Sequence, residues 1–173
     1  MVPGVAFGLL LHTRHWIRGE RGSAGLEPFW ETAERAEADG YDHLWTGDSP
    51  RIAALRNPVL LAHSLATLDA ISSGRLVVGV SVAPQYPYAE QEFAACGVPF
   101  GERAGRLEES IRVMRRLWTE ESFAFEGRYY RFPEIGIQPR PAGPVPIWIA
   151  AGDNEKALGR VARLGDEIGR AHV

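Results

Sequence analysis

Short apolar runs recur along this chain and are separated by stretches in which apolar residues follow a helical spacing. Most of the runs show almost no alternation of apolar and polar positions, which is typical of strands buried on both faces of a sheet. The predicted strands are residues 5–11, 41–46, 76–82 and 147–151.

Helices are predicted between these strands from their apolar spacing and their end signals. The first follows Pro28, and Gly40 is the expected C′ residue after it. Asn57 and Pro58 form an N-cap and a first-turn proline, and they open an apolar helix that stops near Gly74. The clearest helix spans residues 101–118, with Leu107, Ile111, Met114, Leu117 and Trp118 on one face.

The C-terminal third predicts a hairpin and one more strand–helix unit. Residues 123–132 alternate between apolar and polar positions and are expected to turn at Glu126-Gly127. The last predicted helix is capped by Asp153 or Asn154 and ends at Gly165. Strands that alternate with helices indicate an α/β fold with a parallel sheet and helices outside it.

Composition and charge exclude several partner classes. The net charge of the 173 residues is −3, which argues against nucleic acid or an anionic membrane as the main partner. We interpret Arg112, Arg115 and Arg116 as the solvated side of a helix. Cys96 is the only cysteine, so no intrachain disulfide can form, as suits a reducing compartment. No apolar run approaches the ~18 residues that span a bilayer, and residues 1–11 do not resemble a signal peptide, so a cytoplasmic location is expected.

Candidate chemistry lies where the predicted strands end, because ligands of parallel α/β sheets gather at the C-terminal ends of strands. Four clusters follow strand ends, at residues 11–13, 47–49, 81–83 and 150–153. The last joins a strand to a helix N-terminus, where free backbone N–H groups could hold a phosphate. Two alternatives stay open, since Asp48 could simply brace a loop and His12 could be a packed histidine. The sequence has no dinucleotide fingerprint, P-loop or metal-ligand spacing.

Several ordered segments together resemble one enzyme family. They are Asn57-Pro58, residues 66–69 (ATLD), residues 72–80 (SSGRLVVGV), residues 92–100, Glu102-Arg103, residues 106–118, the hairpin, the proline-rich connector, residues 146–149 (PIWI) and residues 160–166. This order is similar to that of luciferase-like flavin-dependent oxidoreductases.

The resemblance implies a partial (β/α)8 TIM barrel of the bacterial-luciferase-like type with a β-hairpin insertion. It implies an oxidoreductase or monooxygenase that uses reduced FMN or the deazaflavin coenzyme F-420, without a metal, for oxygenation or hydride transfer on a small organic substrate. The catalytic candidates are His12, Asp48 and Ser49. The residues expected at the cofactor are Asp48, Ser81, Ala150, Ala151, Gly152 and Asp153.

The chain also departs from the family pattern. Ser49 stands where the family often has His, Ser81 where it often has Gly, and Ala150-Ala151 where it usually has Gly-Gly. We expect one incomplete barrel domain over residues 1–166, with an internal deletion near 49–57, and a non-native tail at 167–173. The alternatives are a non-catalytic flavin-binding protein or a non-functional gene fragment. The oligomeric state stays open, with a homodimer as one alternative.

Overall fold

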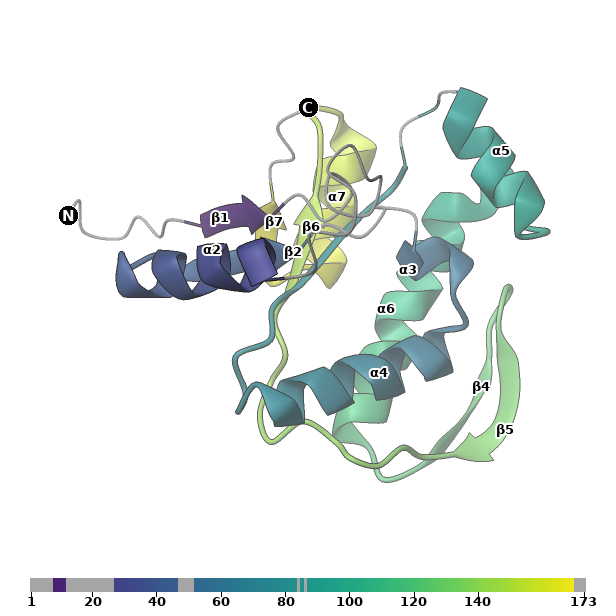
Figure 1. Ribbon diagram of the computed structural model, residues 1–173. Helices are drawn as coiled ribbons and strands as arrows, with labels where there is room; N and C mark the ends of the chain where they lie inside the picture. The colour runs from purple at the N-terminus through teal and green to yellow at the C-terminus, as the bar shows by residue number, and fades with distance from the viewer. Residues whose placement is uncertain (1–7, 12–26, 47–51, 84, 86, 170–173) are drawn as a thin grey trace. The chain divides into compact units, whose positions relative to one another are not determined.

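The computed structural model describes residues 8–11, 27–46, 52–83, 85 and 87–169 (Figure 1). It divides into two compact units, Met1–Ser49 and Pro50–Val173. Each unit is therefore described by itself.

The first unit contains a parallel β–α–β arrangement. Strand β1 (Gly8–Leu11) pairs with β2 (His43–Thr46), and helix α2 (Glu27–Ala38) lies between them in the chain. The helix ends as predicted, because Gly40 adopts a left-handed φ of 81° that a side chain would oppose. The Tyr41 N–H then donates to the carbonyl of Ala36 at 3.0 Å, which closes a Schellman motif.

The second unit has a parallel sheet in the strand order β3–β6–β7 and a separate β-hairpin. Its elements are α3 (Ile52–Leu55), α4 (Pro58–Ile71), β3 (Val78–Ser81), α5 (Pro87–Ala95), a 3-10 turn (Phe100–Glu102), α6 (Arg103–Thr119), β4 (Phe123–Glu126), β5 (Arg131–Ile135), β6 (Ile147–Ala150), α7 (Glu155–Leu164) and β7 (Glu167–Gly169). The alternation of strands and helices predicted from the sequence is confirmed here.

Helix α4 begins and ends at the predicted signals. The side chain of Asn57 accepts a hydrogen bond from the Val59 N–H at 2.9 Å, and Pro58 occupies the first turn. After the helix, Gly74 adopts a φ of 77°, and its N–H donates to the carbonyl of Asp69 at 2.9 Å. The short helix α3, which no sequence signal predicted, lies just before Asn57, within the segment where we expect a deletion. That deletion stays a prediction.

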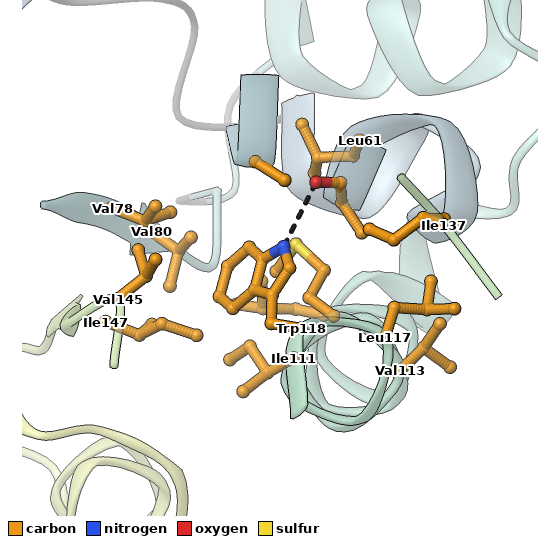
Figure 2. Close-up of a cluster of buried hydrophobic side chains, with 14 of the residues drawn as sticks. Leu61, Val78, Val80, Ile111, Val113, Leu117, Trp118, Ile137, Val145 and Ile147 are labelled. Atoms are coloured by element: carbon orange, nitrogen blue, oxygen red, sulfur yellow. Dashed lines mark hydrogen bonds between the residues drawn. The ribbon is translucent and has the colours of Figure 1, made fainter. Parts of the chain in front are cut away.

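The core of this unit forms where α6 meets α4 and the sheet (Figure 2). The predicted apolar face of α6 is confirmed, because Ile111, Met114 and Leu117 are completely buried. Trp118 also lies in this cluster, and its indole N–H donates to the carbonyl of Ala62 on α4 at 3.0 Å. Burial of these side chains supplies the main stabilisation of the unit. The remaining core side chains come from α4, the connector after β5 and the strands, and include Leu61, Val78, Val80, Ile137, Val145 and Ile147.

The hairpin turns later than predicted, because a carboxylate from α6 organises its tip. Strand β4 ends at Glu126 and β5 begins at Arg131, so residues 127–130 form the connection instead of a tight turn at Glu126-Gly127. The buried Glu109 accepts hydrogen bonds from the backbone N–H groups of residues 128, 129 and 130 at 2.7, 2.9 and 3.2 Å. A Cβ at Gly127 would clash with the same carboxylate and with the Phe125 ring, so a larger residue there would displace these side chains.

Residues 167–169 belong to the segment interpreted as a non-native tail, and they form β7. Its register pairs Trp148 with Glu167 and Ala150 with Gly169. Parallel pairing uses backbone groups that almost any sequence supplies, so the origin of residues 167–173 stays a prediction. Among the described helices, none combines the length and the apolar character needed to cross a membrane.

We predict that Glu109→Gln destabilises the second unit by about 1–3 kcal/mol, because an amide cannot accept three backbone hydrogen bonds and brings its own donors to them. Urea unfolding measures the change. The control is Glu121→Gln, which neutralises an exposed carboxylate and should change stability by no more than about 0.5 kcal/mol. Equal unfolding midpoints for the two variants would show that Glu109 does not hold the hairpin tip.

Candidate functional site

Two of the predicted clusters lie side by side at one edge of the sheet in the second unit. Strands β3 and β6 run parallel, and their register pairs Val78 with Ile147 and Ser81 with Ala150. Strand β7 continues the same edge, with Gly169 opposite Ala150. Ser81 and Ala150 carry small, half-buried side chains, so the backbone at this edge is approachable.

The segment after β6 leads directly into the N-terminus of α7. Asn154 caps the helix, because its side-chain oxygen accepts from the Ala157 N–H at 2.8 Å, which resolves the choice between Asp153 and Asn154. The other N–H groups of a first helical turn have no acceptor within the helix. A Cβ at Gly152 would meet only the Asn154 side chain, at 3.9 Å, so the space beside Gly152 is open.

Charges at this N-terminus are mixed. Asp153 and Glu155 place two exposed carboxylates at the start of α7, and Lys156 places one ammonium group there. The helix dipole and the free N–H groups favour an anion, whereas the two carboxylates oppose one. The backbone of this segment therefore suits a phosphate group better than its side chains do.

The catalytic candidates lie outside the described residues. His12 follows β1 in the sequence, and Asp48 and Ser49 lie shortly after β2. The last residues of these strands, Leu11 and Thr46, are register partners, so the candidates follow strand ends that lie next to each other. The roles of His12, Asp48 and Ser49 stay predictions. In the part of the chain that the structure describes, no three His, Cys, Asp or Glu side chains are grouped to hold a metal ion.

Sequence reasoning missed a set of polar contacts that hold β6 and α7 in place. Asp166 accepts from the Ile147 N–H and from the Arg115 guanidinium, both at 2.8 Å, and so joins the start of β6 to α6. Arg115 also donates to the carbonyl of Leu164 at 3.1 Å, at the end of α7. Arg115, which we interpreted as part of the solvated side of a helix, is 38% exposed but also makes these tertiary contacts, which that interpretation did not include. Helical spacing could not show that Arg115 has tertiary partners whereas Arg112 is mainly solvated, because the partners of Arg115 lie about fifty residues away in the sequence.

Asp166 also has a shifted pKa. Burial alone would raise it, but the hydrogen bonds from Ile147 and Arg115 and the nearby guanidinium charge outweigh burial and hold the pKa of Asp166 below its usual value. The carboxylate is therefore charged at neutral pH, as its ion pair with Arg115 requires.

Comparison with known proteins identifies relatives of this arrangement. Residues 49–169 match the model of the luciferase-like monooxygenase family. An F-420-dependent glucose-6-phosphate dehydrogenase from Intrasporangium calvum is 37% identical over 145 residues, which cover 82% of this chain and 42% of the relative. Another, from Amycolatopsis mediterranei, is 40% identical over 99 residues, covering 56% of this chain and 28% of the relative. The chain therefore spans less than half the length of these relatives.

Solved structures extend the likeness to the fold. The monooxygenase RslO1 from Streptomyces bottropensis is 33% identical with a TM-score of 0.60, covering 69% of this chain and 35% of RslO1. An F-420-dependent secondary alcohol dehydrogenase in complex with an F-420–acetone adduct is 21% identical with a TM-score of 0.72, covering 94% of this chain and 57% of that one. These likenesses confirm the predicted fold class, a partial (β/α)8 barrel of the bacterial-luciferase-like type.

We predict that the stability contributed by Asp166 depends on pH. Because its folded pKa lies below the unfolded value of about 3.9, the contribution is fully present above about pH 5 and is lost as the pH falls through the folded pKa. Asp166→Asn should therefore be less stable than the parent chain at neutral pH, and the gap should narrow on acidification. Urea unfolding from about pH 6 to pH 3 at constant ionic strength measures this, with Glu121→Gln as the control. A gap that stays constant with pH would contradict the assignment.

Proposed function

This chain belongs to the luciferase-like monooxygenase family, and from that membership we propose that it forms part of an oxidoreductase that binds reduced FMN or coenzyme F-420. When bound, reduced F-420 would supply a hydride to a small organic substrate. Reduced FMN would react with oxygen to oxygenate such a substrate. The observation that carries the proposal is the register pairing of Ser81 with Ala150, beside the N-terminus of α7. It supports a phosphate subsite at the edge of the parallel sheet.

Within that subsite we assign the phosphate to the backbone between Ala150 and the first turn of α7. Ala150 and Ala151 each add a methyl group that narrows the approach of a phosphate to the main chain, compared with the Gly-Gly of the family pattern, whereas Gly152 adds none. Ser81 offers a hydroxyl group from the neighbouring strand end. The Asn154 side chain is used in capping, so it does not compete for the phosphate. The backbone N–H groups and the small residues fit a phosphate group, whereas the carboxylates of Asp153 and Glu155 oppose it.

The comparisons support F-420-dependent hydride transfer as the first candidate reaction, because the two curated relatives compared above are named as F-420-dependent dehydrogenases. FMN-dependent oxygenation is the second candidate, and the 33% identity to the monooxygenase RslO1 favours it. His12, Asp48 and Ser49 remain the proposed residues for the ring and the reacting atoms. Their strand ends support this, since catalytic residues of barrel enzymes come from such positions.

We predict that the 173-residue chain binds FMN more tightly than riboflavin, because only FMN carries the phosphate. A charge-assisted phosphate contact should strengthen binding by about 10-fold or more. Quenching of flavin fluorescence during titration with protein gives both dissociation constants, and F-420 is titrated in the same way. Equal affinity for FMN and riboflavin would contradict the phosphate subsite. The absence of binding to both flavins and to F-420 would contradict the proposed function for this chain.

We also predict that Asp153→Asn strengthens FMN binding by about 2- to 5-fold, because it removes a carboxylate that opposes the phosphate at the N-terminus of α7. Riboflavin affinity should not change. The control is Glu121→Gln, which removes one negative charge at a position far in sequence from α7. An equal gain for riboflavin would mean that Asp153 acts on the ring or on the fold and not on the phosphate.

A further inference from the structure

Helix α7 lies on the second unit with few apolar contacts. None of its ten residues, all of which the structure describes, is fully buried. Val161 and Leu164 pack against the core cluster while remaining partly exposed. Burial of apolar area therefore holds this helix weakly, and its polar contacts carry a larger share of its placement than in a buried helix such as α6.

One ion pair joins the middle of α7 to α6. The Arg160 Nε donates to Glu108 Oε1 at 3.0 Å, and the two side chains are only 12% and 21% exposed. Arg163 approaches the same carboxylate oxygen at 3.7 Å, but its side chain is 60% exposed. Arg112 reaches the other oxygen at 3.7 Å and is 50% exposed. Arg160 is thus the close and shielded partner, whereas the other two are solvated.

Glu108 is held firmly by its own helix. It lies on α6 between Leu107, which is completely buried, and Glu109, which binds the hairpin tip. The backbone of α6 at this position is therefore fixed by the core, and Glu108 meets Arg160 from that fixed backbone. The pair joins a weakly packed helix to a rigid one.

The second attachment of α7 is at its opposite end. There Arg115 on α6 donates to the carbonyl of Leu164, the last residue of α7. From Leu164 to the cap at Asn154 the helix rises by about 15 Å, at ~1.5 Å per residue. If the Glu108–Arg160 pair were lost, the N-terminal turns of α7 would lack this link to α6, so they would open and shift more readily than the C-terminal end that Arg115 holds.

We propose that Glu108 and Arg160 are positioning residues for the phosphate subsite: their ion pair fixes the axis of α7, so that its first-turn N–H groups face the edge where β3 and β6 end. This inference rests on the proposed function for its ligand. The placement of the helix itself can be tested without any ligand.

The decisive variant is Glu108→Gln. A long-range charge effect and a positioning role predict opposite changes in its affinity for FMN. Removal of a negative charge should strengthen binding of an anion if only long-range charge matters. If the pair positions α7, Glu108→Gln should instead weaken FMN binding by about 3-fold or more relative to riboflavin. Arg160→Gln should lower the FMN-to-riboflavin affinity ratio by a similar factor, and Arg160→Lys should restore part of it.

The matched control is Arg163→Gln, which makes the same charge change on the same helix at the loosely paired position. It should leave the affinity ratio within about 2-fold of the parent chain. A ratio that falls equally in Arg163→Gln and Arg160→Gln, or that rises in Glu108→Gln, would overturn the proposal in favour of a simple charge effect.

Amide hydrogen exchange supplies the readout that needs no cofactor. The N–H groups of Ala157 and Leu158 bond to Asn154, and they should exchange faster in Glu108→Gln and Arg160→Gln, while the amides of α6 keep their protection. Unchanged exchange at Ala157 and Leu158 would overturn the positioning role. Faster exchange together with equal affinity of the parent chain for FMN and riboflavin would uphold the positioning of α7 and refute the phosphate subsite.

Discussion

The packing of helix α6 is the constraint on which the second unit depends. Its apolar face is buried against α4 and the strands β3 and β6, and Trp118 joins the helix to the Ala62 carbonyl on α4. Because this face is fixed, the polar side chains of α6 lie at fixed positions around the helix. These positions determine where the hairpin, α7 and the start of β6 contact α6.

Three polar residues of α6 make these attachments, and each satisfies a different kind of group. Glu109 binds the backbone N–H groups of the hairpin tip, and Glu108 binds a guanidinium on α7. Arg115 binds the last carbonyl of α7 and the carboxylate of Asp166, which follows α7. Buried or half-buried polar groups of this kind cost stability when one partner is removed. The unit therefore combines an apolar core with polar links of definite geometry, and those links fix the strand-to-helix segment of the proposed site.

The parts of the fold with local signals could be predicted from the sequence. The Asn57-Pro58 start, the ends of two helices at Gly40 and Gly74, and the apolar face of α6 all depend on residues within a few positions of each other. The rule that parallel strands end at one edge predicted that the clusters after residues 81 and 150 lie at the same edge, while the pairing of Ser81 with Ala150 came from the structure. Helix α3 lacked such a signal, because one helical turn is too short to show a periodicity.

The partners of charged residues could not be predicted in this way. Glu108 and Glu109 are adjacent in a helix that reads as amphipathic, yet one meets Arg160 and the other meets a backbone loop. Nothing in the local pattern distinguishes them, because each partner is brought near only by the tertiary fold. The hairpin turn was misplaced for the same reason, since the carboxylate that shapes it comes from another element.

The sequence distances spanned by these links also bear on how the chain folds. Glu109 reaches the hairpin tip across 19 to 21 residues, whereas the links from Trp118 to Ala62, Arg115 to Asp166 and Arg160 to Glu108 span 51 to 56. Closing a loop of about 50 residues in place of about 20 costs roughly 0.8 kcal/mol more in chain entropy. This entropy difference favours docking of the hairpin on α6 before the attachment of α7, which brings together segments far apart in the sequence.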